Sequence, residues 1–172
     1  MRGALLGLAL VSCATTSETT ALKHVQTASI GYDIPDDWDR AQTNRRGIST
    51  TVWTPKDNPD RMSVTVIRSE RSPVTAGADV ATIGQLLVQA QSALHDARLS
   101  PAVEVITPQG LKGARVELDY TPPEAKNRYH RTHVVLADGS GLVHVIFTAR
   151  STERAAAFDT VLASLRHEEV LP

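Results

Sequence analysis

Apolar residues alternate with polar ones over much of the chain, and two other stretches show helical spacing. Alternation bounded by turn-forming residues predicts seven short strands, at 30–34, 48–53, 62–67, 103–106, 114–120, 132–137 and 142–149. Residues 79–98 carry apolar side chains at intervals of three and four, which predicts an amphipathic helix. A second helix is predicted after Ser151, whose hydroxyl can cap the first turn.

Two turn-rich segments indicate how the predicted strands connect. Asp138-Gly139-Ser140-Gly141 is a typical hairpin sequence, and residues 55–60 are rich in Pro, Asn and Asp. Strands joined by short turns pair antiparallel. The pattern therefore predicts an α+β fold, a mostly antiparallel sheet with packed helices, in the order β-β-β-α-β-β-β-β-α. Trp38 and Trp53 are expected in its core, because large aromatic side chains dominate core packing.

The N-terminus opens with an apolar run that ends at the single cysteine of the chain. Residues 3–11 follow the basic Arg2 and carry no charge, and the run ends in Leu10-Val11-Ser12-Cys13. The run is about half as long as the roughly 20 residues that a membrane-spanning helix needs, so it is typical of a signal peptide. Its end resembles the lipobox of bacterial lipoproteins. That resemblance implies cleavage before Cys13 and attachment of lipid to the cysteine.

A buried N-terminal helix with a free core cysteine is the alternative interpretation. The polar residues 14–20 favour a tether instead, because they are too rich in hydroxyl side chains to continue a packed helix. The expected organisation is a signal peptide at 1–12, a lipidated cysteine and flexible tether at 13–28, and one domain at 29–172. Ala14, where the resemblance would place Asp for inner-membrane retention, implies an outer-membrane protein that faces the periplasm.

Composition and charge exclude several classes of function. Eighteen basic and 19 acidic residues leave a formal charge of −1, which provides no field for binding nucleic acid. The 172 residues lack a Gly-rich phosphate loop, a His-Glu-x-x-His metal motif and a Gly-x-Ser-x-Gly nucleophile elbow. We therefore expect no enzyme activity and no cofactor.

The domain resembles a known superfamily in several separate segments. These are Tyr32-Asp33-Ile34-Pro35-Asp36-Asp37-Trp38, the mid-chain helix, Leu111-Lys112-Gly113-Ala114, the late Asp-Gly hairpin, and Ala157-Phe158-Asp159 with Leu162-Ala163-Ser164-Leu165. They are similar to the superfamily of the photosystem extrinsic protein PsbP, the Ran-binding Mog proteins and the bacterial DcrB-type lipoproteins. The resemblance covers about residues 29–168. It implies an accessory or binding protein and supplies no catalytic residue.

Charged and polar side chains on the late strands form the candidate site. A symmetric hairpin pairs Val135 with His144 and His133 with Ile146, which places the two histidines diagonally on one face. The predicted charged strip comprises Arg115, Glu117, Asp119, Arg131, His133 and His144. It would bind a metal or an anionic ligand, or it would be a solvated face whose charges pair. The second interpretation is preferred, and no metal is expected, because two histidines lack a third ligand at metal-site spacing.

Two functions agree with these features. The first is a membrane-anchored, non-enzymatic accessory lipoprotein that docks onto a larger protein assembly of the cell envelope. The second is a lipoprotein that binds a small ligand or a metal. An exposed apolar patch would favour docking, and a concave pocket with convergent polar groups would favour ligand binding.

Overall fold

A computed structural model describes residues 21–27, 29–57, 62–70, 82–84, 96–123, 125–137, 141–150 and 156–168. Cys13, the predicted signal peptide and most of the predicted tether lie outside the described residues. So do the hairpin residues 138–140 and the predicted helix 79–98, apart from a helical turn at 82–84 and the last residues of that range. Among the described residues, no helix is long and apolar enough to cross a membrane.

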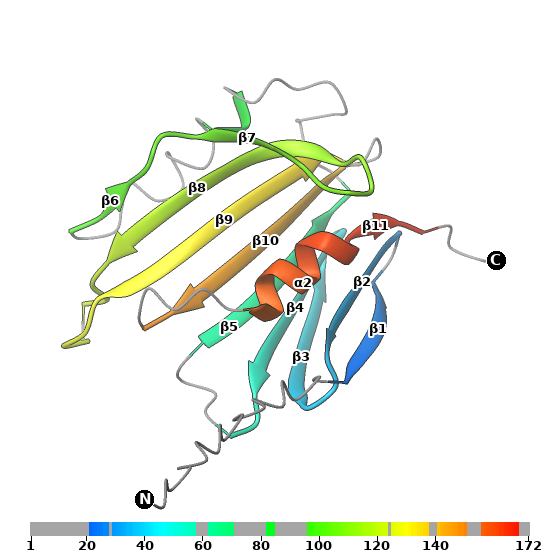
Figure 1. The fold of residues 1–172 in the computed structure, drawn as a ribbon, viewed down its shortest axis with the longest axis horizontal. Helices are drawn as coiled ribbons and strands as arrows, with labels where there is room; N and C mark the ends of the chain where they lie inside the picture. The colour runs from blue at the N-terminus through cyan, green and yellow to red at the C-terminus, as the bar shows by residue number, and fades with distance from the viewer. Residues whose placement is uncertain are drawn as a thin grey trace, which may run out of the picture.

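The described residues form two antiparallel sheets and one helix of nine residues (Figure 1). The large sheet has the strand order β3-β4-β5-β10-β9-β8-β6, with β7 also paired to β8, and the small sheet has the order β1-β2-β11. The elements are β1 (Leu22–Thr27), β2 (Ile30–Pro35), β3 (Trp38–Arg45), β4 (Ile48–Pro55), β5 (Met62–Ser69), β6 (Arg98–Leu99), β7 (Val103–Ile106), β8 (Lys112–Tyr120), β9 (Tyr129–Ala137), β10 (Leu142–Ala149), α2 (Ala156–Ser164) and β11 (Arg166–His167).

One face of the large sheet, here called the inner face, carries the main core. It presents Val64, Val66, Val134, Leu136, Val143, Val145 and Phe147, all buried. Helix α2 and the small sheet pack on this face (Figure 1), with Phe158 of α2 stacked on Phe147 at 5.5 Å between ring centroids. The indole Nε1 of Trp53 donates a hydrogen bond of 3.0 Å to the hydroxyl of Tyr32 and so joins the two sheets. Trp38 and Trp53 are both buried, as predicted.

The opposite face of the large sheet, here called the outer face, has a smaller core. Ile83 packs there with Ala114, Val116 and Val135. The predicted hairpin register is confirmed, because Val135 pairs with His144 and His133 pairs with Ile146. Strand β9 therefore has core residues on both faces, and β8 has them on the outer face.

The predicted α+β class is wrong, because the protein is β-rich and helix is a minor component of the described residues. Four strands had no predicted counterpart: β1, β3, β6 and β11. Every residue of strand β3 after Trp38 is exposed, so the strand shows no alternation of apolar and polar residues. It is a strand because it pairs with β4 and not because one of its faces is buried. Strand β1 lies in the segment assigned to the tether, so ordered structure begins before residue 29.

Candidate functional site

The six residues of the predicted strip do not share one face of the sheet. Val116 of β8 pairs with His133 of β9. Because side chains alternate along a strand, this register places Arg115, Glu117 and Asp119 on the inner face. Arg131, His133 and His144 lie on the outer face. The sequence predicted the β9–β10 register, but the register of β8 against β9 depends on packing that no short turn specifies.

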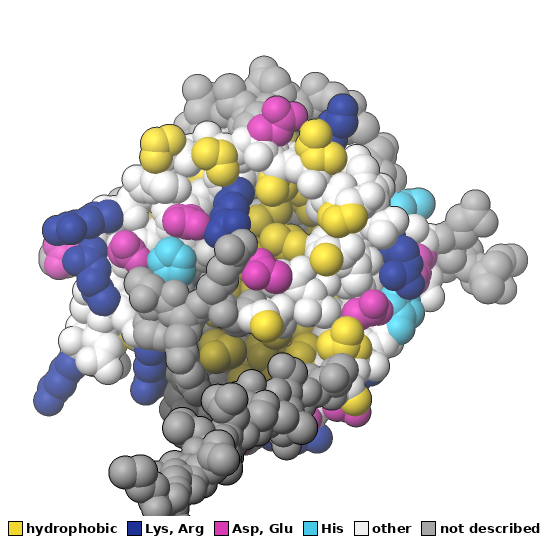
Figure 2. Space-filling view, in the orientation of Figure 1, with side chains coloured by type: hydrophobic (Ala, Val, Ile, Leu, Met, Phe, Trp, Pro, Cys, Tyr) yellow, Lys and Arg dark blue, Asp and Glu magenta, His cyan; other side chains and the backbone are white. Residues whose placement is uncertain are grey.

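The three inner-face residues of β8 pair locally. Arg115 Nη2 lies 2.6 Å from Glu117 Oε1, and Asp119 Oδ1 lies 3.0 Å from Nδ1 of His130 on the neighbouring strand. All four side chains are partly exposed. Figure 2 shows acidic, basic and histidine side chains around the apolar middle of the face that carries α2. These pairs match the interpretation of a solvated surface whose charges compensate one another.

The two histidines of the outer face form a direct hydrogen bond. His133 Nδ1 and His144 Nε2 are 2.9 Å apart, and the ring centroids are 5.1 Å apart. His133 is only 1% exposed, so the solvated-face interpretation does not describe it. Its Nε2 is buried and has no hydrogen-bond partner among the described residues. Only one of the two facing nitrogens carries a hydrogen, so one imidazole donates and the other accepts in this bond.

Burial and a nearby cation keep both imidazoles neutral. Burial lowers the pKa of His133 to about 3, with further lowering by His144 and Arg131. Burial and Arg131 lower the pKa of His144 to about 4. Arg131 is held on the same face by Thr148 Oγ1, 3.1 Å from its Nε, and it lies 4.7 Å from the ring centroid of Tyr120. At neutral pH this cluster therefore carries the charge of Arg131 alone.

The pair can donate or accept hydrogen bonds, but it lacks a carboxylate ligand for a metal. The charged side chains of β8, Arg115, Glu117 and Asp119, lie on the opposite face of the sheet from the two histidines. Within the described ranges, no group of three or more His, Cys, Asp or Glu side chains is placed to hold a metal ion. Zinc sites normally need three or four such ligands.

A second histidine cluster, which the sequence did not reveal, lies on the small sheet. His24 Nδ1 is 2.8 Å from Asp33 Oδ1 across the β1–β2 pair, and His24 Nε2 is 3.0 Å from Glu168 Oε1. Arg166 of β11 adds an ion pair to Glu168 at 2.8 Å. Gly31 lies under Glu168, where a Cβ would come within 2.2 Å of the carboxyl carbon. The cluster joins the first and last described strands of the chain.

No short motif could have predicted this cluster. His24 falls in the segment read as a tether, and Glu168 lies 144 positions further along the chain. The alternation of buried Val25 and Thr27 with exposed His24 and Gln26 is the local signal that was available.

Replacing His24 by Gln should remove a pH-dependent contribution to stability. The hydrogen bond to Asp33, with help from Glu168, raises the pKa of His24. A raised pKa adds stability that is present below the ordinary value of 6.5 and is lost as the pH rises through the folded value. We expect wild type to exceed His24→Gln in thermal midpoint at about pH 6 and the difference to shrink toward about pH 9. The effect should be modest, because His24 is 41% exposed. A constant difference across this range would contradict the role of the His24 charge.

Comparisons with known proteins show the fold alone. No family profile matches the chain, and no curated protein resembles it in sequence. A solved chain from Bacteroides thetaiotaomicron VPI-5482 is 14% identical with a TM-score of 0.56 over 86% of this chain and 48% of that one, so the present chain spans about half its length. LpqN, described as involved in cell envelope biogenesis of Mycobacterium tuberculosis, is 16% identical with a TM-score of 0.53. That similarity covers 87% of this chain and 91% of LpqN.

Proposed function

We propose that the protein is a non-enzymatic accessory lipoprotein of a bacterial cell envelope. In this proposal a lipid on Cys13 anchors the protein in the outer membrane, and the folded domain faces the periplasm. There the domain docks onto a larger protein assembly. The domain belongs with the accessory proteins of the PsbP, Mog and DcrB type in this view. Membrane attachment by two or more acyl chains is stable, because each buried methylene contributes about 0.8 kcal/mol.

The observation that carries this proposal is the similarity to LpqN over nearly the full length of both chains. It makes an envelope role compatible with the fold. The apolar run ending at Cys13 adds independent support from the sequence. Because a fold hosts many functions, the anchor and the docking both need a direct test.

The test expresses the full chain and its Cys13→Ser variant in a bacterial host with radiolabelled palmitate. We expect label and membrane sedimentation only in wild type, because serine lacks the sulfur that forms the thioether. Chemical cross-linking in the same intact cells should yield a discrete larger adduct. The adduct should weaken strongly in Cys13→Ser, since anchoring raises the local concentration of the domain at its partner.

Two outcomes would overturn the proposal. If Cys13→Ser incorporates the label, or if wild type does not, the proposal of a lipid anchor at Cys13 is wrong. If wild type is lipidated but forms no cross-linked adduct, the proposal of docking is wrong and that of the anchor stands. Equal circular dichroism spectra of the two proteins would show that the substitution leaves the fold intact.

Ligand binding is the second candidate function, and one observation favours it. A pocket of about 410 Å³ lies at the β3–β4 turn, away from the predicted strip. Pockets of this size suit small ligands.

A further inference from the structure

We propose that the pocket at the β3–β4 turn binds an oxyanion of the phosphate type. The pocket is lined by the ends of β3, β4 and β5, including Asn44, Ser49 and Glu70. The proposal rests on the second candidate function and not on the anchor at Cys13, so it stands or falls separately from envelope docking.

The charge of the lining is strongly positive. Three arginines, Arg45, Arg46 and Arg68, are among the residues that line the pocket, and Glu70 is the one acidic residue of that lining. The whole chain has a formal charge of −1, so this concentration is local. A guanidinium presents a planar fork of donors that matches phosphate oxygens in pairs. The lining therefore suits a compact anion with several oxygens.

The backbone of the turn holds one of these arginines in an unfavourable conformation. Arg46 has φ of 50° and Gly47 has φ of 79°, between the paired residues Arg45 and Ile48. These angles fit a two-residue hairpin turn that Asn-Gly or Gly-Gly normally fills. An arginine at the first position adds strain, and such strain clusters at functional sites. Its presence is explained if the guanidinium has a role at the pocket.

Arg68 supplies a positive group to the lining that is held in a fixed position. It is 2% exposed, and its guanidinium donates to Ser29 Oγ at 3.3 Å and to the carbonyl oxygen of Ser69 at 2.6 Å. Gly141 leaves the space that this side chain occupies, because a Cβ there would lie 2.3 Å from Arg68 Nη1. A cation held in place loses little side-chain entropy when an anion binds beside it.

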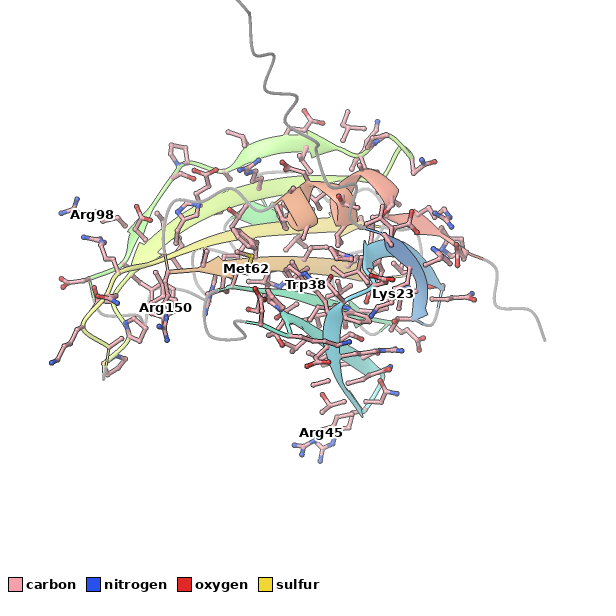
Figure 3. All side chains as sticks on the ribbon, turned by 60° about the horizontal axis from the view of Figure 1, so that its bottom comes forward. Lys23, Trp38, Arg45, Met62, Arg98 and Arg150 are labelled. Atoms are coloured by element: carbon pink, nitrogen blue, oxygen red, sulfur yellow. The ribbon has the colours of Figure 1, made fainter. Side chains whose placement is uncertain are left out.

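Neutral donors complete the lining. The guanidinium of Arg40 donates to Gln42 Oε1. This contact orients the amide so that Gln42 Nε2 lies 3.5 Å from Ser49 Oγ. An amide and a hydroxyl beside the arginines add directional hydrogen bonds for oxygen acceptors. Figure 3 shows Arg45 at the tip of the projecting hairpin, where a ligand can reach it from solvent.

The experiment titrates inorganic phosphate into the full chain in a neutral detergent at constant ionic strength, followed by backbone amide NMR signals. We expect saturable shifts confined to residues 44–49 and 68–70. The variant Arg45→Gln with Arg46→Asn should weaken apparent affinity about tenfold or more, since two charge-assisted contacts are lost. Asn suits the positive φ at position 46, so this variant should fold at least as stably as wild type.

A matched control removes two exposed cations elsewhere, as Arg98→Gln with Lys126→Gln. Arg98 lies at the far end of the large sheet from Arg45 (Figure 3). We expect its affinity to stay close to that of wild type. No saturable shift in wild type, or equal weakening in both variants, would overturn the proposal, because the arginines would then act only as diffuse surface charge.

A second arm distinguishes the source of the anion. The full chain is placed in nanodiscs of phosphatidylcholine with or without phosphatidylglycerol. If phosphatidylglycerol shifts the same amide signals, the site takes a lipid headgroup. If only inorganic phosphate shifts them, it takes a soluble anion. Either result supports an oxyanion site.

Discussion

Phe158→Asp is expected to abolish folding. Phe158 is 3% exposed and stacks on Phe147 beneath α2. Losing a buried aromatic side chain costs about 3–5 kcal/mol, and an unpaired carboxylate in the same space adds a further penalty. The sum approaches the 5–15 kcal/mol that typically stabilises a domain. Thermal unfolding followed by circular dichroism should show no cooperative transition.

Ala163→Asp provides the control within the same helix. Ala163 lies on the exposed side of α2, so a carboxylate there stays in water. We expect a midpoint within a few degrees of wild type, because the carboxylate stays hydrated and its unfavourable interaction with the C-terminus of the helix costs no more than about 1 kcal/mol. A cooperative Phe158→Asp variant of near-normal stability would show that α2 is dispensable for the core.

Acidification is expected to destabilise the protein steeply through His133 and His144. Their folded pKa values of about 3 and about 4 lie well below the ordinary 6.5. Between these limits the unfolded chain binds protons that the folded state excludes, so the free energy of unfolding falls as the pH falls. Each excluded proton contributes roughly 1 kcal/mol per pH unit. Urea unfolding from about pH 7 to about pH 4 measures this slope.

The double variant His133→Gln with His144→Gln isolates this contribution from the titration of carboxylates. We expect it to be less stable than wild type near neutral pH, because the hydrogen bond between His133 and His144 is lost, but its stability should fall less steeply as the pH falls. His24→Gln, whose effect has the opposite sign, should retain the steep acid slope. Identical slopes in wild type and the double variant would mean that the pair takes up protons in the folded state as readily as in the unfolded state.

The two histidine clusters differ because their surroundings differ. His24 is exposed between two carboxylates, which stabilise its charged form. Among the described residues, the titratable groups that act on His133 and His144 are Arg131 and, for His133, its partner His144, and burial disfavours the charged form of both rings. Histidines in one chain therefore respond to pH in opposite directions.

The sequence alone determined the strands in which apolar and polar residues alternate, because this alternation follows the burial of one face. Strand β10 alternates at every position between buried and partly exposed residues, and both it and the β9–β10 register were predicted. Trp38 and Trp53 were predicted in the core from their size alone. These features depend on neighbours along the chain and on the period of two along a strand, which a sequence displays directly.

Only the tertiary structure decided which features come together from distant parts of the chain. Strand β3 is exposed and polar, so pairing with β4 creates it, and the β8–β9 register divides the predicted strip between two faces. The contact of His24 with Glu168 spans 144 positions, and the turn pocket combines Arg45 and Arg46 of one hairpin with Arg68 of strand β5. Such contacts are set by how sheets stack and pair over long separations, and no local period encodes them.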